Sequence, residues 1–275
     1  MINDITIGQF VDTDSPIHKL DPRCKIIFLF AYLILLFCVS SPLCYGILMI
    51  FTAAVILISR IPLKLVFRGL KPILYILIFT ALINLFVTPG EALWSYKLPW
   101  FTMKISREGV KSALLMCVRL LLLVTSSSLL TFTTSPMTLT DGIERLLRPL
   151  SAIKVPAHEI AMMMTIALRF IPTLAEETDK IMKAQTARGA DFESGNMIRR
   201  VKAMLPLLVP LFISAFRRAD DLAEAMDARC YHGGINRTRM KEIRFSRRDL
   251  VAAIVFVILA AVIITVQNIT LIPGR

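Results

Sequence analysis

The sequence IIFLFAYLILLFCVSSPLCYGILMIFTAAVILIS, at residues 26–59, is an apolar run of 34 residues without a charge. At about 1.5 Å per residue, one helix of this length would far exceed the roughly 30 Å of a hydrocarbon core. Ser40-Ser41-Pro42 supplies a turn, because proline has no amide hydrogen and disfavours helix in the preceding residue. The run therefore predicts two membrane spans, near residues 26–39 and 43–59.

Three further stretches predict spans near residues 72–88, 109–132 and 250–267. The composition agrees, since 56% of the 275 residues are hydrophobic and 19% are charged. Such a chain is too apolar for an ordinary soluble or disordered protein. We therefore expect an all-α polytopic membrane protein with about five transmembrane helices.

Basic residues predict the orientation of these spans and the division of the chain. Of the 32 Lys and Arg residues, 19 lie between residues 133 and 249, and others precede the first span. By the positive-inside rule, the N-terminus is cytoplasmic and the C-terminus extracellular in a multi-pass cell-membrane protein. The net charge of +12 is then explained by cytoplasmic loops, without a nucleic-acid partner. The expected division is 1–133 (four spans), 134–249 (cytoplasmic coupling helices) and 250–275 (the last span).

One predicted external loop, residues 91–107, contains three basic residues and therefore departs from the rule. Its alternation of polar and apolar residues, together with Trp94, Tyr96 and Trp100, is typical of a short hairpin at the membrane interface. A plain loop is the alternative.

The region 134–249 predicts long amphipathic helices, because its apolar residues recur every three or four positions. We expect one helix over 197–226, kinked at Pro206 and Pro210, and one over 159–185, broken at Pro172. A shorter helix is expected over 141–150, with Thr140 as its N-cap.

The two long predicted helices end in similar sequences, 41 residues apart. Each finishes in Ala-Arg followed by a small residue, in the order Ala187, Arg188, Gly189 and Ala228, Arg229, Cys230. A single arginine at a helix C-terminus is explained by the helix dipole. Two arginines in matching sequence favour a pair of contacts with acidic grooves on a partner, because guanidinium binds carboxylates through two parallel hydrogen bonds.

These residues resemble the transmembrane T component of energy-coupling factor (ECF) transporters and the related cobalt-transport Q proteins. The resemblance covers essentially the whole chain. It rests on residues 15–25 (SPIHKLDPRCK), on 168–172 (LRFIP) and on the paired motifs at 187–189 and 228–230. Cys230 departs from the family pattern, which has glycine at that position.

The resemblance implies a scaffold that uses ATP hydrolysis on other chains to drive uptake of vitamins or other micronutrients. It implies that Arg188 and Arg229, with their neighbours in the paired motifs, dock into two cytoplasmic ABC-type ATPases. The membrane region and coupling helices would hold a substrate-binding S component. Arg169 and Pro172, in the middle motif, are possible S-component or structural contacts.

Arg119 is the one charged residue deep inside a predicted span, about 12 residues from its start. A charge near mid-bilayer costs about 2.5 kcal/mol or more unless it is paired or hydrated. Arg119 should therefore face protein or water, either at the S component or in a structural pair within the chain.

The sequence lacks the motifs for nucleotide or metal binding. None of the 11 glycines precedes a lysine, so a phosphate-binding loop of the Walker type is absent, and the three histidines lack metal-ligand spacing. We expect no cofactor, no metal and no catalysis by this chain. The alternative is a stand-alone secondary transporter or membrane-embedded enzyme, for which polar residues in several spans would be required; Arg119 and Asn84 are the candidates.

Overall fold

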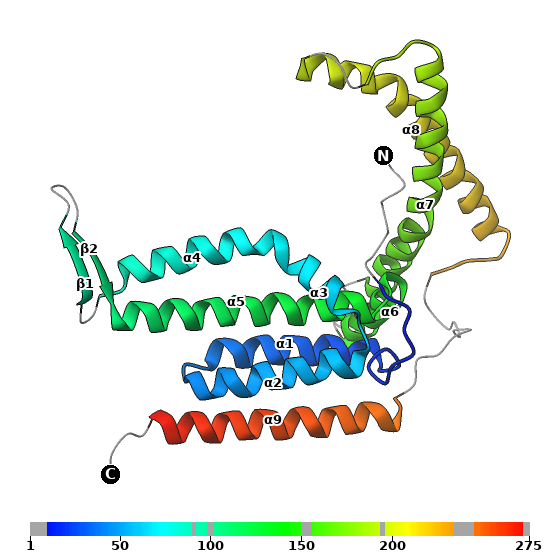
Figure 1. The fold of residues 1–275 in the computed structure, drawn as a ribbon. Helices are drawn as coiled ribbons and strands as arrows, with labels where there is room; N and C mark the ends of the chain where they lie inside the picture. The colour runs from blue at the N-terminus through cyan, green and yellow to red at the C-terminus, as the bar shows by residue number, and fades with distance from the viewer. Residues whose placement is uncertain are drawn as a thin grey trace. The chain divides into compact units, whose positions relative to one another are not determined.

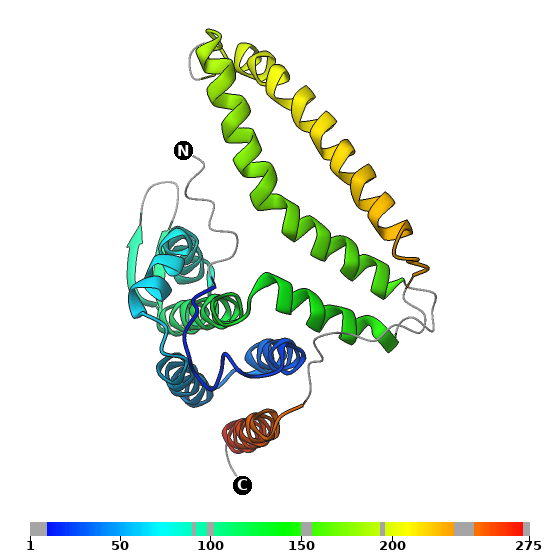
Figure 2. The same cartoon turned by 90° about the vertical axis from the view of Figure 1, so that its right-hand side faces the viewer.

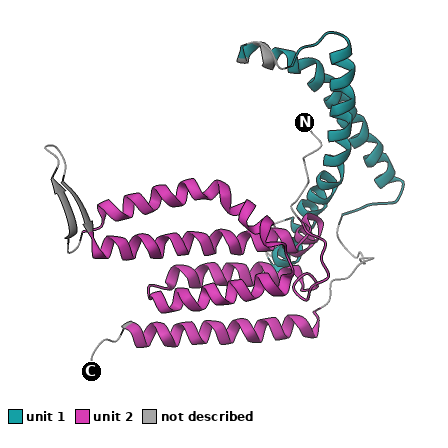
Figure 3. Cartoon of the chain, in the orientation of Figure 1, with its two compact units in different colours: residues 1–7, 143–242 teal, residues 8–142, 243–275 magenta. Residues whose placement is uncertain are grey.

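A computed structural model of the chain divides it into two compact units (Figure 3). Unit 1 comprises residues 1–7 and 143–242, and unit 2 comprises residues 8–142 and 243–275. Each unit is described by itself. The structure describes residues 10–89, 92–97, 102–149, 156–192, 196–233 and 245–271.

Unit 2 consists mainly of long apolar helices joined by short connections (Figure 1). Its elements are α1 (Pro22–Cys38), α2 (Pro42–Ser59), α3 (Leu63–Leu70), the 3-10 turn η1 (Lys71–Ile73), α4 (Leu74–Val87), β1 (Ala92–Lys97), β2 (Thr102–Ser106), α5 (Arg107–Thr133) and α9 (Arg247–Leu271). α6 (Pro136–Leu147) starts in unit 2 and continues into unit 1.

Among the described residues, four helical segments are long and apolar enough to cross a membrane. They are Pro42–Ser59, Leu63–Val87, Arg107–Thr133 and Arg247–Thr270. The first predicted span, α1, is shorter, since its 17 residues extend about 26 Å. Apart from one hairpin the described fold is helical, so the prediction of an all-α polytopic membrane protein is confirmed.

The helices α1, α2, α5 and α9 lie side by side, as both views show (Figures 1 and 2). Their facing sides form an apolar core that includes Leu36, Leu48, Leu122 and Ile263. Their outer sides carry large exposed apolar side chains, such as Phe30, Ile50, Leu57, Val257 and Ile264. Exposed apolar surface of this extent is typical of contact with lipid or a partner protein.

The connection between the second and third spans is itself helical. We predicted a span near residues 72–88, whereas helix already begins with α3 at Leu63 and leads through η1 into α4. Pro72 lacks an amide hydrogen, which removes one hydrogen bond of a regular α-helix. A 3-10 turn at this position carries the chain from one helix into the next.

The expected hairpin in the loop 91–107 is confirmed. β1 and β2 pair in antiparallel register, with Trp94 opposite Ile105 and Lys97 opposite Thr102. Its position at the membrane interface stays a prediction.

The N-terminal segment 15–25, together with Thr13, ties four helix ends of unit 2 together. The Asp21 carboxylate caps α1 by accepting from Arg23 N, and Asp21 N donates to Asp249 Oδ1 of α9 at 2.8 Å. Lys25 Nζ donates to Thr133 O at the end of α5, at 2.8 Å. Thr13 Oγ1 donates to Ser59 O at the end of α2. The start of α1, the ends of α2 and α5 and the start of α9 are therefore at one end of the bundle.

The short helix α6 begins earlier than predicted. Thr140 lies inside it rather than at its N-cap, and its hydroxyl donates to Pro136 O one turn back. Ser135 is at the start instead, because its Oγ accepts from Thr138 N at 3.4 Å. The sequence Ser135-Pro136 was the usable signal, since serine is a preferred N-cap and proline a preferred first helical residue.

Unit 1 contains two helices of 31 residues each, α7 (Ala157–Ala187) and α8 (Met197–Asp227). The predicted break at Pro172 is wrong, because α7 continues through it. α8 also continues through Pro206 and Pro210, and the kinks expected there stay a prediction. A proline in a helix removes a single intrahelical donor, and more than a dozen residues flank Pro172 on either side, so the helix persists.

Candidate functional site

The two Ala-Arg motifs, residues 187–189 and 228–230, are called the arginine tips. The first tip, at the end of α7, is a regular helix ending. Arg188 is the C-cap of α7, and Gly189 follows in the left-handed conformation, with φ of +89°. Gly189 N donates to Thr186 O at 2.9 Å and Ala190 N to Gln185 O at 3.0 Å. This pair of hydrogen bonds is the Schellman motif, which satisfies carbonyls at the end of a helix.

The second tip has the same geometry despite its different sequence. Cys230 N donates to Asp227 O at 2.9 Å, and Tyr231 N donates to Met226 O at 3.0 Å. Cys230 takes the position of Gly189 and has φ of +54°. Left-handed backbone costs a residue with a Cβ roughly 1–2 kcal/mol. The departure from glycine therefore leaves the turn unchanged and adds local strain.

Both tips are open to contact. The six residues that we predicted for docking are all exposed: Ala187, Arg188, Gly189, Ala228, Arg229 and Cys230. Within the described residues, neither Arg188 nor Arg229 takes part in an ion pair. Each guanidinium is therefore available to an external acceptor.

The helices α7 and α8 cross and contact each other (Figure 1). Arg218 Nη2 donates to Glu177 Oε2 at 2.8 Å. Arg188 follows Glu177 by 11 residues, and Arg229 follows Arg218 by the same 11. At 1.5 Å per residue, each arginine lies roughly 16 Å along its helix from this contact. The helix segments 177–188 and 218–229 are therefore two arms of equal length, and each arm ends at one arginine tip.

The contact at the crossing is electrostatically stable near neutral pH. A hydrogen bond from Ser214 and the adjacent Arg218 guanidinium hold the pKa of Glu177 below its usual range. The carboxylate therefore stays ionised and keeps its pairing with Arg218. Glu177 and Arg218 also differ by 41, the offset that relates the two tips. Because these two equivalent positions carry opposite charges, Glu177 and Arg218 attract each other where the helices meet.

Unit 1 exposes further residues that suit a partner. Arg169 and Pro172 are exposed on α7 and, three residues apart, lie on neighbouring positions of one face. α8 exposes large apolar side chains, among them Leu205, Leu208 and Phe212. Exposed apolar surface next to basic residues is typical of protein or membrane contact. The role of Arg169 and Pro172 stays a prediction.

Arg119 has partners within its own unit. Its Nε donates to Tyr45 Oη at 2.7 Å and its Nη2 donates to Val39 O at 3.1 Å. Val39 follows the last residue of α1, so Arg119 lies level with the turn between α1 and α2. These hydrogen bonds are those expected of a structural role within the chain. They give the guanidinium two acceptors that the sequence alone did not identify. A contact with an S component stays a prediction.

The described residues contain no group of three or more His, Cys, Asp and Glu side chains that could bind a metal ion. Free thiols are present at Cys24, Cys38, Cys44, Cys117 and Cys230, of which Cys38 and Cys230 are exposed.

Comparison with known proteins places this arrangement in a family. Residues 13–242, which include both tips and the N-terminal segment, match the CbiQ family, described as cobalt transport protein. The chain is 56% identical to the energy-coupling factor transporter transmembrane protein EcfT of Ruminiclostridium cellulolyticum, over 96% of this chain and 98% of that protein. It is 43% identical to EcfT of Bacillus subtilis, over the same shares of the two chains.

The chain belongs to the CbiQ and EcfT family. The function expected from the sequence, that of a transmembrane energy-coupling component of an ECF transporter, is confirmed at this level. Both arginine tips were predicted from their local sequence, whereas the contacts of Glu177, Arg218 and Asp249 were not. The 41-residue offset relates Glu177 to Arg218, but equivalent positions alone do not predict a contact. Nothing near Asp249 in the sequence points to Asp21, which lies 228 residues away.

Proposed function

We propose that the two arginine tips dock into two cytoplasmic ABC-type ATPase subunits and that the crossed helices transmit ATPase closure to a membrane-embedded S component. ATP is hydrolysed on the partner chains, and the cargo is a vitamin or another micronutrient bound by the S component. The observation that carries this proposal is the pair of matching helix endings at equal distances from one contact. Each has an exposed arginine that forms no ion pair within the described residues.

The geometry favours two equivalent partners over one. Arg188 and Arg229 lie on matching turns at the ends of equal arms. Two copies of one acidic groove, related by twofold symmetry, would receive both tips in the same way. In each groove a carboxylate would accept two hydrogen bonds from the guanidinium.

The experiment replaces both arginines with glutamate and measures co-purification of the ATPases and substrate uptake by the reconstituted complex. We expect both to be lost, because a carboxylate on each tip would meet acidic groove residues. The matched control is Lys180→Glu with Arg217→Glu, which makes the same charge change at exposed positions away from the tips. Full retention of the ATPases by the tip variant would refute docking.

The proposed orientation puts the N-terminus and both tips in the cytoplasm, with the C-terminus outside. In support, the start of α1 and the end of α5 lie at one end of the bundle. A variant that keeps Cys230 as its only cysteine tests this orientation. A membrane-impermeant thiol reagent should label it in inverted vesicles and not in intact cells; the reverse labelling would reject the assignment.

A further inference from the structure

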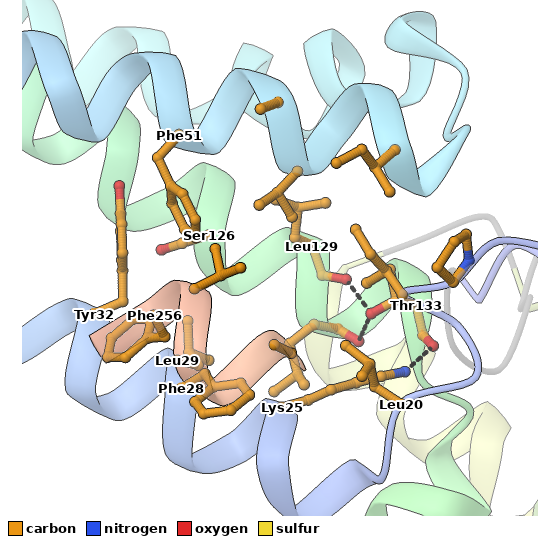
Figure 4. A pocket seen from close by; sticks show the side chains of 18 of the residues that line it. Leu20, Lys25, Phe28, Leu29, Tyr32, Phe51, Ser126, Leu129, Thr133 and Phe256 are labelled. Atoms are coloured by element: carbon orange, nitrogen blue, oxygen red, sulfur yellow. Dashed lines mark hydrogen bonds between the residues drawn. The ribbon is translucent and has the colours of Figure 1, made fainter. Parts of the chain in front are cut away.

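Unit 2 contains an apolar cavity of about 620 Å³ between α1, α2, α5 and α9 (Figure 4). α1 and α2 each pack against α5 and α9, which leaves space between them. Side chains from all four helices line this space, including Phe28, Phe51, Leu129 and Phe256.

The cavity has the depth of one leaflet of a bilayer. Its wall on α9 extends from Arg247 to Phe256, which is about 14 Å of helix and roughly half of a 30 Å hydrocarbon core. At the inner end Tyr32 Oη and Thr52 Oγ1 hydrogen-bond to each other at 2.7 Å. That end therefore presents no free hydroxyl pair to a polar ligand.

The charges at the other end favour an anion. Among the described residues, no acidic side chain lines the cavity, and Arg247 and Arg248 lie in its wall. Both are exposed and, within the described residues, form no ion pair. They are the first two residues of α9, where the positive end of the helix dipole disfavours cations. An anion beside them would relieve this unfavourable arrangement.

Asp14 is the acidic group that acts on Arg248, since their attraction adds to the larger effect of Lys19 in lowering the pKa of Asp14. Its carboxylate forms an ion pair with Lys19. Lys25, also in the wall, donates to Thr133 O, Thr134 Oγ1 and His18 O, so its three donors are occupied. The Asp249 carboxylate accepts from Asp21 N and Ser246 N. The interior is therefore apolar, and the two arginines are the available charges.

We propose that this cavity holds an acyl chain of one anionic phospholipid, whose phosphate lies at Arg247 and Arg248. A lipid combines a long apolar chain with an anion at one end, as the cavity requires. The proposal concerns unit 2 alone and does not depend on docking at the arginine tips.

The test uses the purified full chain after delipidation, with native mass spectrometry of added phosphatidylglycerol or phosphatidylcholine. We expect retention of one phosphatidylglycerol with at least tenfold preference. Arg247→Gln with Arg248→Gln should remove the preference, whereas the control Arg60→Gln with Arg68→Gln, outside the cavity, should keep it. Equal retention of both lipids by the unchanged chain would overturn the headgroup site.

A second measurement locates the acyl chain. Phosphatidylglycerol with a diazirine on its acyl chain should cross-link to cavity-lining residues on α1, α2, α5 or α9. Cross-links confined to the outer surface of the bundle would overturn the cavity as the binding place. An Ala252→Cys variant tests the other occupant. If it cross-links to a helix of a partner subunit while no lipid is retained, the lipid proposal is overturned.

Discussion

The N-terminal segment 15–25 and the two arginine tips both carry part of the family resemblance, yet Asp21 and Lys25 of the segment have surroundings opposite to those of the tip arginines. Asp21 and Lys25 are buried, and their hydrogen bonds go to other parts of the same unit. Arg188 and Arg229 are exposed and unpaired within the described residues. A charge satisfied inside its own chain stabilises the fold, whereas a charge left available suits a partner. Similar motifs in a sequence can therefore have different physical roles.

The largest effect expected from this comparison is on partner affinity. Arg188→Glu or Arg229→Glu alone should weaken ATPase binding at least 30-fold, since breaking one partner of a desolvated charge pair costs roughly 2–5 kcal/mol. The thermal unfolding temperature should stay unchanged. Titration of the purified chain with ATPases and a thermal melt measure the two quantities. A lowered melting temperature with unchanged affinity would assign the arginines to the fold.

The opposite result is expected in the N-terminal segment. Lys25→Met should destabilise unit 2 by about 2–3 kcal/mol, because it removes charged hydrogen bonds to Thr133 O and neighbouring acceptors. ATPase affinity of the folded fraction should not change. Lys19→Met, at an exposed residue of the same segment, is the control and should have little effect. Equal stability of the two variants would contradict a structural role for Lys25.

A smaller effect is expected where α7 crosses α8. The pKa of Glu177 is lowered from its usual 4.5 in the folded chain, so its interaction stabilises the crossing above that pH. This contribution is lost as the pH falls through the lowered pKa. Spin labels at Lys183→Cys and Glu224→Cys, in a chain without other cysteines, should report a broader distance distribution at a pH low enough to protonate Glu177 than at neutral pH.

Two controls isolate Glu177 in that experiment. Glu177→Gln should give the broad distribution at both pH values, whereas Glu176→Gln, at the adjacent exposed position, should keep the pH dependence. A pH response that persists without the Glu177 carboxylate would mean that another group controls the crossing.

The smallest effect concerns the two turns themselves. Gly189→Ala should cost roughly 1–2 kcal/mol locally, because alanine disfavours a positive φ, and Cys230→Gly should relieve a similar strain. Hydrogen exchange at Ala190 N should become faster in the first variant, and exchange at Tyr231 N slower in the second. Unchanged exchange in both would show that the turns tolerate a Cβ without strain.

Much of the fold could be predicted from local sequence. Charge-free stretches gave the spans, and the three-to-four periodicity gave α8 nearly to the residue. Proline was the main source of error: the helix persists through Pro172, while at Pro72 a 3-10 turn continues it. Whether a proline ends a helix depends on the packing around it, which a single sequence does not contain.

The site was predictable to a different extent. The arginine tips were visible as a repeated local sequence, because capping depends on neighbours along the chain. The distant partners of Asp21, Lys25 and Arg119 were not, since their hydrogen bonds with Asp249, Thr133 and Tyr45 join residues 74 to 228 positions apart. Such pairings follow from helix packing.

The equal spacing of Glu177 to Arg188 and of Arg218 to Arg229 has a mechanical consequence. Forces of the same size on the two arginine tips exert balanced torques about the Glu177–Arg218 contact. α7 and α8 then change the angle between them while the contact itself stays in place. Unequal loading tilts the whole pair instead. A symmetrical motor would thus produce scissoring, and a motor engaged on one side would produce rotation.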